Sequence, residues 1–387
     1  MRIALLTDGI FPHVIGGMQR HSFYLAKYLA AAGVQVDLYH TIPGGKKEGA
    51  FDLFTGEEKK NLRSFVIPFP DFGRMPGHYI RESYEYSCRV WKKLNSETLP
   101  DFIYVKGFAG WELLNRKSKG EKLPPVGLNF HGYEMFQPQP GFVSWLQSRF
   151  LLRSPVLFNV RHADYLFSYG GKITALIRSL GAGAEKIIEI PTGISREWLF
   201  TGTPEVHAPR RFVFVGRNER RKGLCELHEA IAQLPGTMEF AFSFVGDIPP
   251  KKWVKDARLT YHGEIKDSAA LKNILRDADV LVCPSFSEGM PNVVMEALAS
   301  GLAVIATDTG ATSEMVNESN GWLISPGDVA QLAGALEKAI TLSPDALAAK
   351  KAGAVKHVEN NFLWEKVAGL TIEKISRVCL QGSGDVL

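Results

Sequence analysis

Short runs of apolar and β-branched residues alternate with helical patterns along the first half of the chain. Residues 3–7 form the first run, and a glycine-containing loop and apolar positions at helical spacing, ending at Gly33, follow it. Five further runs repeat this rhythm, at residues 34–39, 102–105, 126–130, 165–168 and 187–190. Strands that alternate with helices predict a parallel sheet covered by helices on both faces.

The same rhythm restarts at Arg211, after a stretch rich in Pro, Gly and Thr. The runs of this second series are residues 212–215, 240–245, 259–262, 280–283 and 304–307. Two such series predict an α/β protein with two doubly wound domains, residues 1–192 and 193–365. An amphipathic pattern near the end predicts a helix over about 366–380 that packs back on the first domain. Residues 42–100 show a weak strand pattern, and no order of elements is predicted there.

Composition and charge narrow the class of protein. Hydrophobic residues make up 45% and charged residues 22%, which is typical of a globular chain. A formal net charge of +4 is too small to indicate nucleic-acid binding. The four cysteines are isolated, with no CxxC or zinc-ligand spacing. No secretory signal and no run of 18 apolar residues is found, so we expect a cytoplasmic protein, or one attached to the inner face of the membrane.

The stretch 140–153 is the candidate for such attachment, because residues 145–153 mix aromatic side chains, leucines and arginines. An interfacial helix that contacts anionic lipid has this composition. An ordinary helix packed on the sheet has it as well, and the sequence leaves both alternatives open.

The clearest candidate chemistry lies in Ser287–Leu298, SEGMPNVVMEAL, where two glutamates are eight positions apart. Proline suits the first turn of a helix, so a helix should begin near Pro291 and run through Ala299. The free N–H groups of Asn292 and Val293 would then point out of its positive end, which favours phosphate. Each glutamate alone could equally be an ordinary solvated side chain.

A basic loop and a glycine pair are the other candidates for phosphate contacts. Arg217 and Lys222 follow a predicted strand and can hold a diphosphate, although a solvated basic loop would look similar. Gly16 and Gly17 precede a predicted helix and allow close approach of the backbone to a ligand. No GxGxxG follows the first strand, which argues against a nicotinamide enzyme.

The segment PSFSEGMPNVVMEALASGLAVIATDTGATSEMV resembles the E-x7-E segment of retaining glycosyltransferases of family 4, which have the GT-B fold. Other matches follow in the expected order. They are FPHVIGGMQRHSFYLAKYL at 11–29, NFHGYE at 129–134, IPTGI at 190–194 and FVGRNERRKGL at 214–224. The resemblance covers most of the chain and is weakest over residues 42–100. It implies two Rossmann-like domains that face one another across a cleft, with the acceptor bound by residues 1–192 and the nucleotide-sugar donor by residues 193–365.

The resemblance also implies roles for individual residues. Arg217 and Lys222 would hold the diphosphate of a nucleotide sugar, and Arg220 and Arg221 would be solvated neighbours. His131 would lie near the donor sugar. The remaining implied donor contacts are the sugar at Glu288, Gly289 and Met290, the ribose at Glu296, and the base at Ile265. Four residues predicted from local structure complete the donor site: Asn292 and Val293 at the phosphates, and Gly16 and Gly17, whose backbone can approach the phosphate or the acceptor.

The implied activity is transfer of a hexose-type sugar from a nucleotide diphosphate, UDP favoured over GDP, to a hydroxyl acceptor. The catalytic residues would be His131, Arg217, Lys222 and Glu288, the configuration of the sugar would be retained, and neither a metal nor a cofactor would be needed. The DxD triplet Asp277-Ala278-Asp279 is interpreted as a helix end and a turn rather than a metal site. A non-catalytic sugar-nucleotide binding protein and a GT-B epimerase are the alternatives. The base, sugar, acceptor and oligomeric state are not determined.

Overall fold

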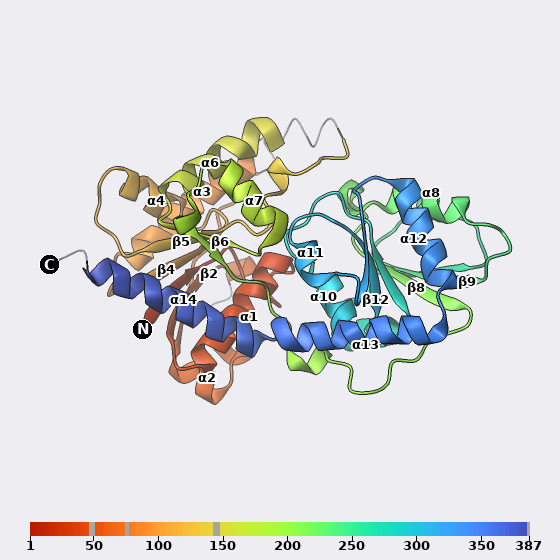
Figure 1. Cartoon of the computed structure of the whole chain (residues 1–387). Coiled ribbons are helices and arrows are strands. Elements are labelled where there is room, and N and C mark those ends of the chain that lie inside the picture. Colours follow the sequence, from red (N-terminus) through yellow and green to blue (C-terminus); the bar gives the residue numbers. More distant parts are fainter. Residues whose placement is uncertain (46–50, 74–76, 142–147, 385–387) are drawn as a thin grey trace. The chain divides into compact units, whose positions relative to one another are not determined.

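The computed structural model describes residues 1–45, 51–73, 77–141 and 148–384 of the 387-residue chain. These residues form two compact units (Figure 1). Unit 1 comprises Met1–Phe136, Leu146–Gly193 and Trp364–Leu387, and unit 2 comprises Gln137–Trp145 and Ile194–Leu363.

Unit 1 contains a seven-stranded parallel sheet in the order β3-β2-β1-β4-β5-β6-β7. Its strands are β1 Arg2–Leu6, β2 Gln35–His40, β3 Leu62–Val66, β4 Phe102–Lys106, β5 Val126–Asn129, β6 Tyr165–Ser168 and β7 Ile187–Glu189. Its helices are α1 Gly17–Ala31, α2 Gly56–Lys60, α3 His78–Leu94, α4 Trp111–Ser118, α6 Arg153–His162, α7 Gly171–Ser179 and α14 Trp364–Gly384. This is the doubly wound sheet that the sequence predicts.

Helices α1 and α14 share the core of unit 1. Leu25 and Leu29 of α1, one turn apart, are buried with Ile3 and Leu5 of β1. Residues of α14 from Trp364 to Val378 belong to the same cluster. The last helix therefore completes the unit in which the chain begins.

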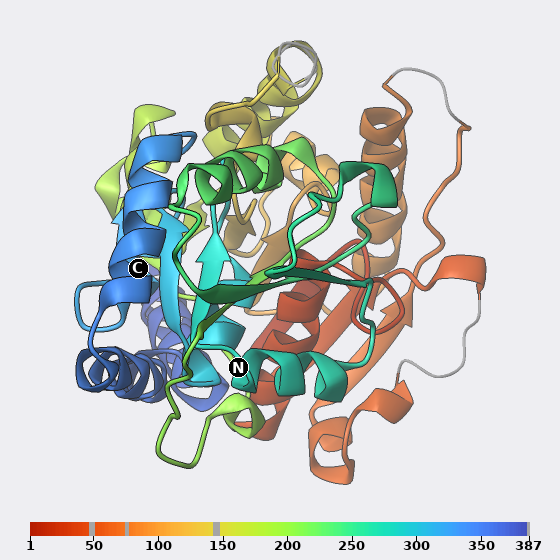
Figure 2. The same cartoon turned by 90° about the vertical axis from the view of Figure 1, so that its right-hand side faces the viewer.

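Unit 2 contains a six-stranded parallel sheet in the order β10-β9-β8-β11-β12-β13. Its strands are β8 Arg210–Val215, β9 Phe240–Val245, β10 Leu259–Gly263, β11 Val280–Cys283, β12 Ala303–Thr307 and β13 Gly321–Ile324. Its helices are α8 Leu224–Gln233, α9 Ser268–Arg276, α10 Asn292–Ala299, α11 Thr312–Met315, α12 Val329–Thr341 and α13 Pro344–Asn361. Helices α8 and α12 contact each other, α10 contacts α13, and the strands lie between helices (Figure 2).

The structure orders the region that the sequence left open. Strand β3 pairs with β2, but only its first residue is fully buried, so its apolar pattern is weak. The buried face of α3 carries Glu82, Ser83 and Ser87 beside its apolar residues. Glu82 accepts hydrogen bonds from Phe72 N–H (2.8 Å) and His78 Nδ1 (3.0 Å), which satisfies its buried carboxylate. These polar residues hide the helical period from a search for apolar positions.

One strand near the C-terminus was not predicted. It is β13, in which Trp322 is partly buried and Leu323 is exposed. The helix predicted over about 366–380 is present as α14, which begins at Trp364, and the preceding helix α13 ends at Asn361. Between them Leu363 forms a β-bridge with Ile194, whose N–H donates to Phe362 O at 2.8 Å. This pairing separates α13 from α14.

Candidate active site

The loop that follows β8 brings basic side chains to the carboxyl end of the sheet in unit 2. It ends at Gly223, whose φ of +73° lies in the left-handed region. A Cβ on Gly223 would lie 2.0 Å from the carbonyl oxygen of Pro284, directly after β11. Only glycine allows this approach, so the loop is held against the chain that leads to Glu288.

Glu288 and Lys222 form a close ion pair at this point. Lys222 Nζ lies 2.6 Å from Glu288 Oε1, and Arg221 Nη1 lies 3.7 Å from Glu288 Oε2. Glu288 is buried. Burial alone would raise the pKa of its carboxyl group, but the charges of Lys222 and Arg221 outweigh burial and hold that pKa below its usual value. Glu288 is therefore a buried carboxylate that stays ionised.

The three arginines of the loop differ from the expected division of roles. Arg217 is exposed, with 73% of its side chain accessible, and pairs with Glu219 at 2.9 Å. Arg220 pairs with Glu226 and lies over the ring of Phe286. Arg221 is only 25% exposed, and its Nη1 donates to Ser287 O at 3.2 Å. The expectation that Arg221 is a solvated neighbour is wrong, because the turn at Arg220–Lys222 directs it toward Glu288.

Helix α10 begins where the sequence predicts. Pro291 is its N-cap, Asn292–Ala299 are helical, and Gly301 follows its end with a φ of +83°. Val294 N–H donates to Pro291 O at 3.1 Å, so Asn292 and Val293 are the residues whose N–H groups face out of the helix end. Glu288 precedes this end by one short turn.

A second backbone contact fixes the turn between Glu288 and α10. Ala311 N–H donates to Gly289 O at 2.7 Å. Gly310 has a φ of +57°, and a Cβ there would lie 2.3 Å from the carbonyl oxygens of both Glu288 and Gly289. The turn therefore packs backbone to backbone on the loop after β12, and Met290 is buried beside it.

Gln137 is a contact that the sequence did not reveal. Its Nε2 donates to Glu288 O at 2.6 Å, and its Oε1 accepts from Glu288 N–H at 3.3 Å. The two residues lie 151 positions apart, so no local pattern connects them. Glu296 is buried on α10, and Ile265 is partly buried after β10. Their proposed contacts with the ribose and the base stay predictions.

The glycine pair of unit 1 lies at the start of α1. Gly16 is its N-cap and Gly17 its first residue. A Cβ on Gly16 would lie 2.1 Å from Gln19 Oε1. Gln19 Nε2 in turn donates to Asp8 Oδ1 at 2.8 Å, in the loop after β1. The glycine loop is thus joined to Asp8 through one amide side chain.

His131 is held in a strained backbone conformation directly after β5. Its φ is +60°, which is uncommon for a non-glycine residue, and its N–H donates to Asn129 Oδ1 at 2.7 Å. Nδ1 contacts the hydroxyl of Tyr169. Burial, and then the nearby Lys106, lower the pKa of His131 well below its usual value. The other ring nitrogen, Nε2, is buried without a hydrogen-bond partner among the described residues, and is free to contact a ligand.

Lys106 is a further residue that the sequence analysis missed. It ends β4 and is fully buried, with Nζ 3.0 Å from His21 Nδ1 and 3.3 Å from the hydroxyl of Tyr104. Burial lowers the pKa of Lys106 well below its usual value. A lysine that ends a buried strand was the signal that could have drawn attention to it. Since His21 and His131 are also basic, Lys106 favours their neutral forms.

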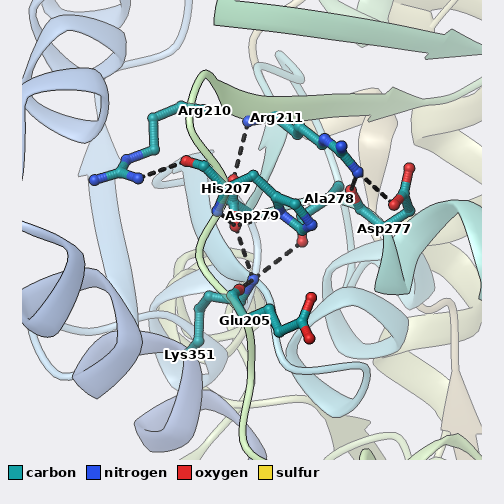
Figure 3. A network of polar contacts seen from close by, with 8 residues as sticks. All are labelled: Glu205, His207, Arg210, Arg211, Asp277, Ala278, Asp279 and Lys351. Carbon is teal, nitrogen blue, oxygen red and sulfur yellow. Dashed lines mark hydrogen bonds and ion pairs between the residues drawn. The ribbon is translucent and has the colours of Figure 1, made fainter.

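The triplet Asp277-Ala278-Asp279 belongs to a different network, at the amino end of β11 (Figure 3). Helix α9 ends at Arg276 and Asp277 is its C-cap, which confirms the interpretation as a helix end and a turn. Asp279 is fully buried and accepts from Lys351 Nζ at 3.0 Å and from Arg211 N–H at 3.0 Å. Within the described ranges, no group of three or more His, Cys, Asp and Glu side chains is arranged to hold a metal ion.

Two units of parallel strands covered by helices are the architecture of the GT-B fold, and comparison with known proteins gives the family. Residues 15–198 match the model described as Glycosyltransferase Family 4, and residues 209–341 match that of Glycosyl transferases group 1. The chain belongs to glycosyltransferase family 4. It is 26% identical to glycogen synthase of Mycobacterium tuberculosis, over 96% of this chain and 94% of that protein. A shorter segment, 33% of this chain and 32% of the relative, is 41% identical to a putative teichuronic acid biosynthesis glycosyltransferase, TuaC, of Bacillus subtilis.

Solved structures agree on the fold. Sucrose-phosphate synthase from Thermosynechococcus elongatus superposes with a TM-score of 0.75 at 20% identity, over 98% of this chain and 99% of that one. Anabaena HepE in complex with UDP-glucose superposes with a TM-score of 0.67 at 18% identity, over 97% and 100% of the two chains.

Two expectations concern membranes. None of the described helices is both long and apolar enough to cross a membrane. The proposed membrane contact at 140–153 falls partly on residues 142–147, which lie outside the described residues.

Proposed function

We propose that this glycosyltransferase moves a hexose-type sugar from a nucleotide diphosphate, UDP in preference to GDP, to a hydroxyl acceptor with retention of configuration. The product would be a glycan, a glycolipid or a cell-envelope polysaccharide. The observation that carries the proposal is the buried Glu288–Lys222 ion pair beside the start of α10. The preference for UDP rests on the similarity to HepE, whose solved complex contains UDP-glucose.

Charge stabilisation is the role proposed for the basic loop. Three cations, Arg217, Arg221 and Lys222, share two carboxylates, Glu219 and Glu288. The loop therefore keeps one net positive charge that a diphosphate can neutralise. As the glycosidic bond breaks, negative charge grows on the leaving phosphate, and fixed cations and helix N–H groups stabilise it. Because these groups would stabilise the leaving phosphate, we propose that transfer needs neither a metal ion nor a cofactor.

Positioning of the donor sugar is the role proposed for Glu288. An ionised, buried carboxylate accepts hydrogen bonds from sugar hydroxyls, and Lys222 fixes its orientation. The turn at Gly289 and Met290 would offer backbone N–H groups to the same sugar. His131, with Nε2 free, is the proposed hydrogen-bonding partner for a donor hydroxyl in unit 1.

Front-face substitution is the mechanism that we propose. The acceptor oxygen forms its bond to the anomeric carbon on the face from which the phosphate departs. The bond between that carbon and the phosphate oxygen breaks, and its electron pair stays on the phosphate. That oxygen takes the proton of the acceptor hydroxyl, so no separate base is required.

The test has two steps. A thermal-shift screen of UDP-, GDP- and ADP-sugars should give the largest increase in melting temperature with a UDP-sugar. Transfer from that donor, followed by proton NMR of the product, should show the anomeric configuration of the donor and should persist in excess EDTA. Inversion of the anomeric centre, or a loss of activity that added magnesium or manganese restores, would refute the mechanism. Turnover without any acceptor would favour the epimerase alternative.

A further inference from the structure

Unit 1 contains a cavity of about 370 Å³ at the carboxyl ends of its first three strands. Asp8, Val14 and Gln19 line one side, after β1 and at the start of α1. Segments after β2 and β3 line the rest, with Thr41, Ile42, Pro43, Gly44, Pro68 and Phe69. The volume falls within the roughly 300–1,000 Å³ of small-molecule sites. The functional residues inferred above do not line this cavity.

Asp8 is the only charged side chain among the nine lining residues, and none of them is a lysine, an arginine or a histidine. Its carboxylate accepts a hydrogen bond from Gln19 Nε2 at Oδ1 and one from its own backbone N–H. A carboxylate has about four acceptor positions, so acceptor capacity remains for a ligand. The charge of Asp8 acts on Tyr79 and Tyr86 of α3, whose pKa values are raised by burial and then by that charge, so both phenols are neutral. His40 directly precedes the lining residue Thr41, and burial lowers the pKa of His40 to about 4, so its ring is neutral as well.

Gln19 connects this cavity to the glycine loop. One end of its amide bonds Asp8, and the other end, Oε1, occupies the space that a Cβ on Gly16 would need. Gln19 therefore links a lining residue of the cavity to the backbone at Gly16. If Gly16 contacts the donor, a second substrate in this cavity would be bound one side chain away from it.

We propose that this cavity is the acceptor site, and that it takes a neutral, hydroxyl-rich ring such as an uncharged sugar or cyclitol. Asp8 accepts hydrogen bonds from the ring's hydroxyls, with Gln19 beside it. The inference rests on the proposed function, because it assigns the second substrate of that reaction.

Charge and shape both favour this class. A phosphorylated or carboxylated ring would bring a second negative charge beside Asp8, and like charges in a partly buried site repel strongly. Val14, Ile42, Pro43 and Phe69 offer apolar surface to the C–H face of a ring. The cavity thus combines carboxylate oxygens, which accept hydrogen bonds, with apolar walls. This combination fits a polyhydroxylated ring better than it fits a purely apolar ligand.

The experiment measures sugar binding without donor by saturation-transfer NMR. The probes are glucose, galactose, mannose and inositol, compared with glucose 6-phosphate and glucuronate. At least one neutral probe should bind, and the anionic probes should bind more weakly. Asp8→Ala should weaken neutral binding by about tenfold or more, the effect of losing hydrogen bonds to a charged acceptor. Asp52→Ala removes an exposed carboxylate of the same unit and is the matched control, with no expected effect.

The melting temperature of a second variant separates loss of binding from loss of folding. Burial raises the pKa of Asp8 to about 6, which means that the fold disfavours its ionised form. We therefore expect Asp8→Asn to leave the melting temperature unlowered. Asp8→Asn should also narrow the difference between neutral and anionic probes. Absence of any sugar binding, equal binding of anionic probes, or unchanged binding in Asp8→Ala would each overturn the proposal. Titration with UDP, which Asp8→Ala should leave unchanged, tests the donor site separately.

Discussion

Two lysine–carboxylate pairs of unit 2 lie at opposite ends of the same sheet. Lys351 pairs with Asp279 directly before β11 begins, and Lys222 pairs with Glu288 after β11 has ended. Both carboxylates are buried, and both pairs are close, at 3.0 Å and 2.6 Å. Their surroundings differ, and the difference separates a pair satisfied within the protein from a pair suited to bind a ligand.

Protein groups occupy the acceptor positions of Asp279. It accepts from Lys351, from the N–H groups of His207 and Arg211, and from His207 Nδ1 (Figure 3). Lys351 Nζ also donates to the carbonyl oxygens of Glu205 and Ala278. The pair ties the segment before β8, the start of β11 and helix α13 together. No ligand is needed to satisfy its charges.

The pair at Glu288 is instead part of a loop with excess positive charge. Arg221 shares its carboxylate with Lys222, and the open end of α10 adds further partial positive charge. A buried pair that is fully satisfied by the backbone stabilises the fold, whereas a pair with surplus charge at the carboxyl ends of strands is suited to bind an anion.

The largest expected effect is the loss of stability in Lys351→Met. Breaking a buried pair leaves Asp279 with an uncompensated charge, which costs about 3–5 kcal/mol of unfolding free energy. Urea denaturation measures it. Lys356→Met, an exposed position of the same helix, is the control and should change little. A Lys351→Met protein as stable as the control would show that this pair does not hold the fold.

Lys222→Met should show the opposite pattern. Loss of a charge that stabilises the leaving diphosphate should reduce kcat by about 10²–10³, or roughly 3–4 kcal/mol. Its unfolding free energy should fall less than that of Lys351→Met, because Arg221 remains beside Glu288. The two quantities are measured on the same preparations. If Lys222→Met lost as much unfolding free energy as Lys351→Met and kept its turnover, the Lys222–Glu288 pair would be structural rather than catalytic.

Alanine substitutions of Arg217, Arg220 and Arg221 test which side chains of the loop after β8 contribute to turnover. Arg221→Ala should reduce kcat by about tenfold or more, since it loses a charged partner of the Glu288 turn. Arg217→Ala, at an exposed position, should act only through its contact with the diphosphate. Arg220→Ala removes a pair with Glu226, worth about 0.2–1 kcal/mol, and should leave kcat within about threefold. If Arg220→Ala proves the most damaging of the three, the diphosphate lies elsewhere on the loop.

Sequence reasoning performed well where local chemistry determines the structure. The proline before α10, the alternation of runs and glycines, and the spacing of Glu288 and Glu296 are local signals, and the helix begins where they predict. It failed for Arg221, because the three adjacent basic residues Arg220, Arg221 and Lys222 look alike until the turn that ends at Gly223 fixes their directions. Gln137 and Lys106 act through contacts across long sequence distances, and β3 and α3 bury polar residues. No local period encodes these contacts.

The smallest expected effect concerns pH. The pKa of Glu288 is lowered in the folded protein, so its charge contributes stability above the unfolded value, and this contribution is lost as pH falls through the folded pKa. Part of the acid-side decline in unfolding free energy should therefore be absent in Glu288→Gln. Lys351 behaves differently, because burial lowers its pKa in the folded protein. Between this folded pKa and the usual pKa of lysine the unfolded chain binds more protons, so the unfolding free energy should increase as pH rises through that range. If the unfolding free energy of Glu288→Gln declined at low pH as steeply as that of the wild type, the lowered pKa of Glu288 would be contradicted.

The central claim is that the Lys222–Glu288 region binds the charged leaving group of the donor without a metal. Isothermal titration of UDP into the wild-type protein and into Lys222→Met, both in excess EDTA, tests it most directly. We expect the wild type to bind UDP and Lys222→Met to bind it about tenfold to hundredfold more weakly, as expected for loss of a hydrogen bond to a charged group. Equal affinities of the two proteins for UDP in EDTA would contradict the account.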